Sequence, residues 1–422
     1  MLNKILIAIT LLLAVLVGVL AVSLANCGRK TLSDIPDAGT GAGTDGGNGA
    51  EGEPKASFSA LDKLVLASYY PWYGFKDSNW ADQILDPPLF GSYNSADLKL
   101  IKAHLGLAYE SGIDAFLMSW TTEGENPDKV LQQMLDEINS SDKYGNFKVG
   151  IYYESVYNHP DSSDETFAKD FSYIISKYGN NNALLKVDGK PVIFVYTPDQ
   201  LPVGRWETIL ARVSSKAFYV AAPNSWDFDL GYLDSFDSVA AYGDKYITDA
   251  DLLKAYSDAS SRLASKGEPL ISTIFGGCGR VQKMGFDIDR SDGKYIQQRY
   301  NVAKQAGANW IYITSWNEWY EGNQLDPSRD CEFRGTKAVR EMAASFKGIT
   351  AAPLSGASIS KSGSTIINNG KQNVYALKCS NNSSTISYLL GPNETASVSS
   401  SCSSAEGYLV DGAKVSTSAG GY

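Results

Sequence analysis

The feature that most constrains the fold is a regular alternation of short β-rich runs with helical stretches from about residue 60 onward. Eight runs have the length and composition of strands: 64–70, 113–119, 148–153, 191–196, 217–221, 238–242, 270–274 and 310–315. Between them lie helix-like patterns, such as 95–111, 128–138, 164–177, 249–265 and 294–306. Eight strand–helix units predict an α/β fold, the (β/α)₈ TIM barrel. An open doubly wound sheet is the alternative, and it is disfavoured because no GxGxxG motif follows the first run.

The loops after the predicted strands are rich in aromatic and carboxylate residues. In a barrel of this type, function lies on the loops that follow the carboxyl ends of the strands. Aromatic rings offer flat faces for sugar rings, although core packing is the alternative for each of them. The aromatic candidates for substrate contact in these loops are Tyr70, Trp72, Tyr73, Trp120, Tyr196, Trp226 and Tyr242, and Glu154 adds a carboxylate after the third run.

The loop after the eighth run places Glu318 and Glu321 three positions apart among large aromatic residues. On a helical turn, residues at this spacing have Cβ atoms about 5–6 Å apart. Two carboxyls this close interact, so one is expected to hold a proton and the other to be ionised, which supplies an acid and a base. Carboxyls about 5 Å apart are also typical of retaining glycosidases. The alternative is a pair of surface glutamates at a helix start, where negative charge is favourable.

Composition excludes several other classes of protein. The formal net charge of -10 argues against a nucleic-acid partner, because a phosphate-binding face needs clustered Lys and Arg. The chain has only two histidines, His104 and His159, which argues against a His-centred triad or a His-rich metal site. No HExxH, CxxC or P-loop motif is present. We therefore expect no metal, no cofactor and no nucleic acid, and we expect a monomer.

The N-terminal segment, residues 1–30, predicts an export signal or membrane anchor. Its apolar run from Ile5 to about Ala25 is long enough to span a bilayer at roughly 1.5 Å per residue. Three readings stay open: an uncleaved anchor, a lipoprotein modified at Cys27, and a cleaved signal. All three place the rest of the chain outside the cytoplasm. Residues 31–58, which are rich in Gly, Asp, Glu and Thr, predict a flexible acidic linker.

The catalytic barrel is expected at 59–348, and the last segment, 349–422, predicts a small Ser-rich β module. Alternating runs at 373–379 and 385–390 indicate strands of that module. Apart from Cys27, the cysteines allow three pairings, and an oxidising compartment favours disulfides. We favour the pairs Cys379–Cys402 and Cys278–Cys331, with four free buried thiols as the alternative.

The eighth loop, residues 314–327, reads TSWNEWYEGNQLDP and resembles the signature of glycoside hydrolase family 99 and its relatives, the endo-α-mannosidase and endo-α-mannanase group. Other segments resemble the family in the same order, and the likeness spans about residues 62–345. These segments are Tyr69-Tyr70-Pro71-Trp72-Tyr73, residues 112–120, Ile151-Tyr152-Tyr153-Glu154, and Asp188-Gly189-Lys190-Pro191 followed by Val195-Tyr196.

The resemblance implies a (β/α)₈ barrel and retention through a 1,2-anhydro sugar, without a covalent enzyme–sugar intermediate. Carried over by position, Glu318 is the base toward the substrate's own 2-hydroxyl, and Glu321 is the general acid and then the general base. Glu154 is expected to bind the sugar near that 2-hydroxyl. The motif adds three further candidate substrate contacts, Asn317, Trp319 and Tyr320.

The chain departs from the family pattern at Tyr320, where the family usually has His, and at Leu325-Asp326, where it has Ile-Glu. Both changes bear on the substrate more than on the reaction class. We therefore predict a membrane-tethered, extracytoplasmic retaining glycoside hydrolase, endo-acting on α-mannose-containing glycans. Two alternatives stay open: a protein of surface-polysaccharide processing or transfer, and a non-catalytic glycan-binding barrel. The presence of both Glu318 and Glu321 argues against the second.

Overall fold

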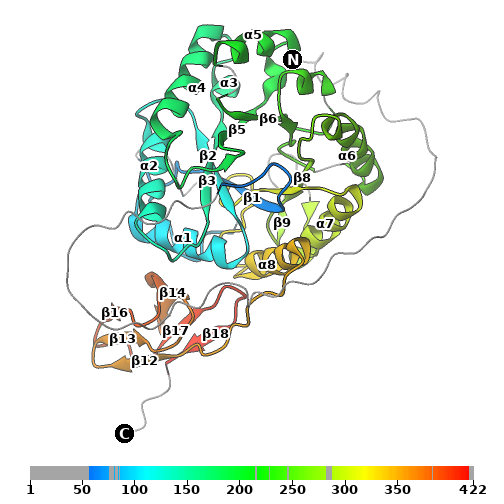
Figure 1. Cartoon of the computed structure of the whole chain (residues 1–422). Helices are drawn as coiled ribbons and strands as arrows, with labels where there is room; N and C mark the ends of the chain where they lie inside the picture. The colour runs from blue at the N-terminus through cyan, green and yellow to red at the C-terminus, as the bar shows by residue number, and fades with distance from the viewer. Residues whose placement is uncertain are drawn as a thin grey trace, which may run out of the picture.

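Eight parallel strands form a nearly closed barrel surrounded by helices, as predicted (Figure 1). The computed structural model describes residues 57–417, except 76–79, 81–83, 85, 214–215, 228, 245–246, 282–287 and 383. Around the barrel the strands follow the order β7-β6-β5-β3-β2-β1-β11-β8. Their bounds are β1 Leu64–Tyr69, β2 Ala115–Trp120, β3 Lys148–Tyr153, β5 Lys190–Tyr196, β6 Phe218–Ala222, β7 Ser238–Val239, β8 Ile271–Phe275 and β11 Trp310–Thr314.

The barrel lacks backbone pairing between β7 and β8, and side-chain hydroxyls bridge this gap. The Ser238 hydroxyl donates to the carbonyl oxygen of Pro269 at 2.7 Å, and the Thr273 hydroxyl donates to that of Ala241 at 2.5 Å. Strand β7 is shorter than the run expected at 238–242, because the Tyr242 N–H bonds to the loop carbonyl of Pro223 instead. These side-chain hydrogen bonds therefore connect the β7 and β8 segments in place of backbone pairing.

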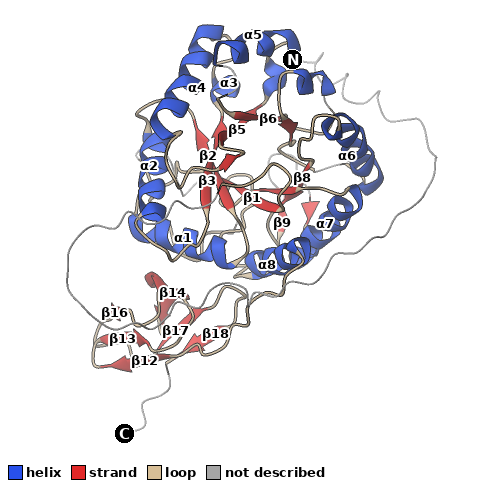
Figure 2. Cartoon of the chain, in the orientation of Figure 1, coloured by secondary structure: helices blue, strands red, loops and turns tan. Residues whose placement is uncertain are grey.

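The helices cover the outside of the barrel (Figure 2). They are α1 Leu98–Glu110, α2 Asn126–Asn139, α3 Ser155–Asn158, α4 Asp164–Tyr178, α5 Val203–Val213, α6 Asp249–Ala264, α7 Lys294–Ala306 and α8 Arg334–Lys347. Asp97 and Thr248 cap α1 and α6 through their side chains. Short elements lie in the connections between the barrel strands and helices: β4 Lys186–Val187, β9 Arg280–Val281, β10 Ile288–Asp289, η2 Pro198–Gln200, η3 Leu230–Asp234 and η4 Ser291–Gly293.

Two small antiparallel sheets follow the barrel and pack beside α1 and α8 (Figure 1). One sheet contains β12 Ile359–Ser362, β13 Thr365–Asn368 and β16 Thr395–Ser397, and the other contains β14 Val374–Cys379, β15 Thr385–Leu390, β17 Ala405–Tyr408 and β18 Lys414–Ser416. The rings of Phe333 and Tyr408 stack across the junction with centroids 5.0 Å apart. We refer to residues 359–417 as the β module.

Both favoured cysteine pairings are confirmed. Cys278 and Cys331 form a disulfide in the barrel, and Cys379 and Cys402 form one within the β module. The predicted membrane segment at 1–30 and nearly all of the linker at 31–58 lie outside the described residues. Within the described part of the chain, no helix is long and apolar enough to cross a membrane.

Candidate active site

The loop after β11, residues 315–326, is anchored to the barrel by two polar side chains. Asn317 is fully buried, and its amide accepts from the Tyr70 N–H at 2.7 Å and donates to the Tyr70 carbonyl at 2.8 Å. Ser315 accepts from the Glu318 N–H at 2.7 Å and donates to the Asn323 side chain at 2.6 Å. Asn317, a predicted substrate contact, is thus occupied in fixing this loop against β1. We call residues 315–326 the β11 loop.

Glu318 lies in a buried environment and is 5% exposed. Its Oε1 accepts from the Tyr73 hydroxyl at 3.2 Å and from the Tyr320 N–H at 3.0 Å. Burial raises the pKa of Glu318 well above its usual range, and the nearby charge of Glu321 raises this pKa further. The Glu318 carboxyl is therefore more basic than that of an ordinary glutamate.

Glu321 lies on the same turn, in which the Gly322 N–H bonds to the Glu318 carbonyl at 3.1 Å. Its Oε2 accepts from the Tyr242 hydroxyl at 2.7 Å and from the Asn323 amide at 2.9 Å. The turn is hydrogen-bonded but is not part of a helix. The two glutamates therefore have separate sets of partners, since Glu318 faces Tyr73 and Glu321 faces Tyr242.

Glu154 follows β3 and is 8% exposed. Burial raises its pKa to about 7; the Ser119 hydroxyl opposes this rise, and the charge of Glu321 adds to it. The same two carboxyls, Glu154 and Glu321, raise the pKa of the Tyr196 hydroxyl, which burial has already raised. Three carboxyls from two strand ends thus act on one another electrostatically within one site. Such a group can hold and move protons near neutral pH.

The predicted aromatic residues divide into two groups. Several surround the carboxyls: Tyr70, Trp72, Tyr73, Tyr196, Tyr242 and Tyr320, with ring centroids 4.6 Å apart for Tyr70–Trp72 and 5.4 Å for Tyr73–Tyr320. Trp120 and Trp319 instead belong to the core. Trp120 is fully buried, and its indole donates to Asp128 in α2 at 2.9 Å. Trp319 is 1% exposed and donates to the Tyr93 hydroxyl at 2.8 Å.

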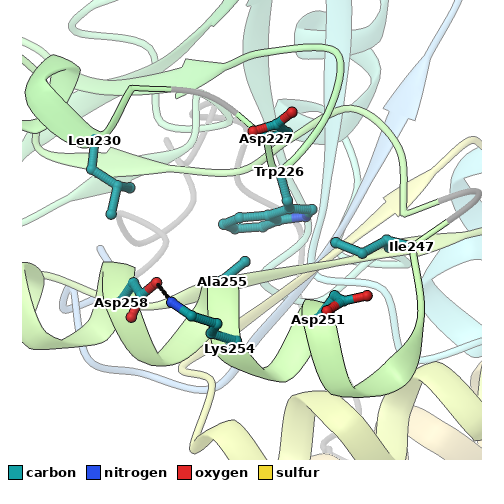
Figure 3. Close-up of a pocket in the computed structure, with 8 residues that line it drawn as sticks. All are labelled: Trp226, Asp227, Leu230, Ile247, Asp251, Lys254, Ala255 and Asp258. Atoms are coloured by element: carbon teal, nitrogen blue, oxygen red, sulfur yellow. Dashed lines mark hydrogen bonds and ion pairs between the residues drawn. The ribbon is translucent and has the colours of Figure 1, made fainter. Parts of the chain in front are cut away.

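Trp226 lies apart from the carboxyls, in a separate pocket of about 320 Å³ between its loop and α6 (Figure 3). Its ring meets the Tyr256 ring edge to face, with centroids 4.7 Å apart. Lys254 and Asp258, one turn apart on α6, form an ion pair at 2.5 Å on the helix side of this pocket. The structure therefore does not bring Trp226 together with the other candidate site residues.

Comparison with known proteins finds similarity to one family of glycoside hydrolases. A model of glycosyl hydrolase family 99 matches residues 79–225. The rat glycoprotein endo-alpha-1,2-mannosidase is 25% identical over 339 residues, covering 65% of this chain and 71% of the relative. The Xenopus laevis protein of the same name is 27% identical over 269 residues, or 57% of each chain. The chain is therefore similar to glycoside hydrolase family 99 and its relatives. It is a glycoside hydrolase.

A solved family 99 structure has the same fold. The endo-alpha-mannosidase of Bacteroides thetaiotaomicron aligns with a TM-score of 0.58 at 21% identity, covering 68% of this chain and 98% of that one. The alignment leaves about a third of this chain uncovered and almost none of the relative. The family model spans Glu154 but ends before Glu318 and Glu321, so the roles of these two residues remain proposals.

Tyr320 and Asp326, where this chain departs from the family pattern, occupy different environments in the structure. Tyr320 is partly exposed beside Tyr73, whose hydroxyl contacts Glu318. Asp326 is 1% exposed and lies behind the β11 loop, with its Oδ2 3.2 Å from His104 Nε2. The change at Asp326 therefore concerns the support of the β11 loop, whereas the change at Tyr320 lies beside a partner of Glu318.

Sequence reasoning missed the residues that hold this candidate site in place. Asn323 contacts both Glu321 and the Tyr242 hydroxyl, and Tyr93 and His104 lie behind the β11 loop. Only Asn323 stood in the recognised motif; the other two come from the region between β1 and the end of α1, where nothing marks them. Within the described ranges, no group of three or more His, Cys, Asp or Glu could hold a metal ion.

Proposed function

We propose that this chain is a retaining hydrolase that cleaves within α-mannose-containing glycans. The observation that carries the proposal is the placement of Glu318 and Glu321 on one turn with separate partners, Tyr73 for one and Tyr242 for the other. Two carboxyls on one turn reach adjacent atoms of a sugar, namely its 2-hydroxyl and its glycosidic oxygen. The mannosidase names of the rat and Xenopus relatives support mannose as the sugar.

In the first step, Glu318 removes the proton of the substrate's 2-hydroxyl, and O2 attacks the anomeric carbon. The bond to the leaving sugar breaks, and the leaving oxygen takes a proton from Glu321. In the second step, Glu321 removes a proton from water, which attacks the anomeric carbon and opens the 1,2-anhydro ring. O2 then takes the proton back from Glu318. Two inversions at one carbon give net retention.

The environments of the two carboxyls suit these roles. Burial makes Glu318 a stronger base once it is ionised, as removal of a hydroxyl proton requires. Glu321 is less buried and is held by Tyr242 and Asn323, which orients its carboxyl between the leaving oxygen and incoming water. Glu154, with a pKa raised to about 7 chiefly by burial, is placed to bind the 2-hydroxyl or a neighbouring one.

The same proposal places substrate against the aromatic residues around the carboxyls, chiefly Tyr70, Trp72 and Tyr320. We further propose that the enzyme acts outside the cytoplasm, because two disulfides persist only in an oxidising compartment. A membrane anchor and a monomeric state are part of the same proposal, the anchor resting on the apolar N-terminal run.

The test is hydrolysis of α-mannan oligosaccharides by the Glu321→Gln variant, with Glu207→Gln as a matched control. Glu207 is an exposed residue of α5, so its change leaves the site untouched. Loss of the general acid is expected to lower kcat by about 10²–10⁴-fold, while the melting temperature stays near that of the wild type. Full activity of Glu321→Gln contradicts the assignment. Products joined to an added acceptor sugar would favour transfer over hydrolysis.

A further inference from the structure

A buried tyrosine hydroxyl lies at the centre of the contacts behind the β11 loop. Tyr93, between β1 and α1, is 2% exposed. Its hydroxyl donates to Asp326 Oδ2 at 3.0 Å and accepts from Trp319 Nε1 at 2.8 Å and from Asn317 Nδ2 at 3.4 Å. A phenol has one proton and two acceptor positions, so this hydroxyl has all its hydrogen-bonding capacity in use.

The hydrogen bond to Asp326, which lies beside His104, fixes the direction of the Tyr93 proton. The Tyr93 hydroxyl donates to Asp326 Oδ2, so its proton points toward Asp326 and not toward the β11 loop. The other side of Asp326 Oδ2 lies 3.2 Å from His104 Nε2, and His104 Nδ1 lies 3.1 Å from the Tyr69 hydroxyl. This N···O approach of His104 to Asp326 lacks hydrogen-bond geometry, so the Tyr93 hydroxyl is the donor that Asp326 Oδ2 accepts from. The lone pairs of Tyr93 are then left for the β11 loop.

The two loop groups that Tyr93 accepts from are the immediate neighbours of Glu318. Asn317 holds the loop to the backbone of Tyr70, and the Trp319 N–H bonds to the Tyr73 hydroxyl at 2.9 Å. That Tyr73 hydroxyl donates in turn to Glu318. A shift of either neighbour therefore changes where the Glu318 carboxyl points.

We propose that Tyr93, oriented by Asp326, is the positioning residue for Glu318. This inference rests on the proposed role of Glu318 as the base. Tyr93 does not touch the substrate; it acts through Asn317 and Trp319. Without its hydroxyl, two N–H groups and a carboxylate lose a partner inside the protein, and the β11 loop must move to find others.

The test compares Tyr93→Phe with Tyr300→Phe as a matched control. Tyr300 is equally buried, at 2% exposed. Its hydroxyl bonds to Ser345 at 3.0 Å, in the contact between α7 and α8. Both variants lose one buried hydroxyl, so both should lose stability. Only Tyr93→Phe is expected to lower kcat, by about 10–100-fold with KM changed less than about threefold, because misplacing a reacting group by an ångström costs about this much. The acidic limb of its pH–kcat profile should also move, since the surroundings of Glu318 change.

If Tyr93→Phe has the same kcat and the same acidic limb of the pH–kcat profile as Tyr300→Phe, the inference is overturned. Asp326→Asn is the second variant: its amide frees the Tyr93 proton to turn, and a similar loss of kcat is expected. A signature independent of activity is the Trp319 fluorescence, obtained by subtracting the signal of the matching Trp319→Phe protein because the chain has eight tryptophans. This signal should change in Tyr93→Phe and not in Tyr300→Phe. A wild type without glycan hydrolysis would defeat the proposed function, whereas an unchanged Trp319 signal in Tyr93→Phe would defeat this inference alone.

Discussion

At the scale of single residues, partners rather than residue type separate the two glutamates. Glu318 is buried against Tyr73, and its pKa is raised by burial and then by Glu321. Glu321 is less buried and receives two hydrogen bonds, from Tyr242 and Asn323. Different surroundings of this kind allow one carboxyl to act as base and the other as acid at the same pH.

The raised pKa of Glu318 predicts the pH dependence of the reaction. A base must be ionised, so kcat/KM should rise with pH along an acidic limb that lies above the ordinary glutamate pKa of 4.5. The charge of Glu154 is among the lesser causes of the raised pKa of Glu318, so Glu154→Gln should move this limb to lower pH. A pH series of initial rates for wild type, Glu154→Gln and Glu207→Gln measures the shift. A limb that stays in place in Glu154→Gln would show that this carboxyl does not act on the base.

At the scale of elements, the join between β2 and α2 depends on Asp128. Its carboxyl accepts from Trp120 Nε1 at 2.9 Å, from the Tyr178 hydroxyl at 2.7 Å and from Lys177 Nζ at 3.0 Å. Burial by itself would raise the pKa of Asp128, but these hydrogen bonds outweigh it and lower the pKa to about 2. The loop after β2 is thereby tied to α4 as well as to α2.

Asp128→Asn is expected to destabilise the barrel by about 1–3 kcal/mol at pH 7, because an amide NH₂ would face donors. A lowered pKa means that the stabilisation is present above the usual value of 3.8 and is lost as pH falls through about 2. The difference in unfolding free energy between wild type and Asp128→Asn should therefore shrink between pH 4 and pH 2. Urea unfolding at several pH values measures it, and a difference that is the same at pH 7 and pH 3 would contradict the account.

The elements show what sequence reasoning reaches. All eight barrel strands could be predicted, because buried parallel strands read as short apolar runs bounded by helices. Helices α5 and α8 were not identified, and the predicted strand at 238–242 is shorter because a loop carbonyl takes its last N–H. Trp120 shows why the site could be predicted only in part. Its position at the end of a strand does not tell whether its ring points into the site or, as here, toward Asp128 in α2.

At the scale of the whole molecule, the β module is docked on the barrel through a buried carboxyl. Glu110, the last residue of α1, accepts from the Asn373 amide at 2.6 Å and from the Tyr375 hydroxyl at 3.0 Å. Burial raises the pKa of Glu110 to about 7, although these hydrogen bonds act in the opposite direction. Alternation could indicate strands in this segment, but nothing local to it could predict a contact with α1, which joins residues more than 260 positions apart.

Glu110→Gln should change the pH dependence of stability. A raised carboxyl pKa means that its stabilisation is full below the usual 4.5 and is lost as pH rises through about 7. Wild type should therefore lose about 1–3 kcal/mol more than Glu110→Gln between pH 5 and pH 8. Thermal unfolding of both proteins at the two pH values measures this. Parallel curves would show that Glu110 is ionised throughout and that the docking is insensitive to pH.

The central claim is net retention by two carboxyls on one turn, and the stereochemistry of the first product tests it most directly. Wild-type enzyme is mixed with an α-mannan oligosaccharide, and the anomeric protons are followed by NMR from the first turnover. The account predicts that the α-anomer appears first and later mutarotates, and that neither Glu318→Gln nor Glu321→Gln produces it at a comparable rate. A β-anomer formed first, or full activity in either variant, would contradict the account.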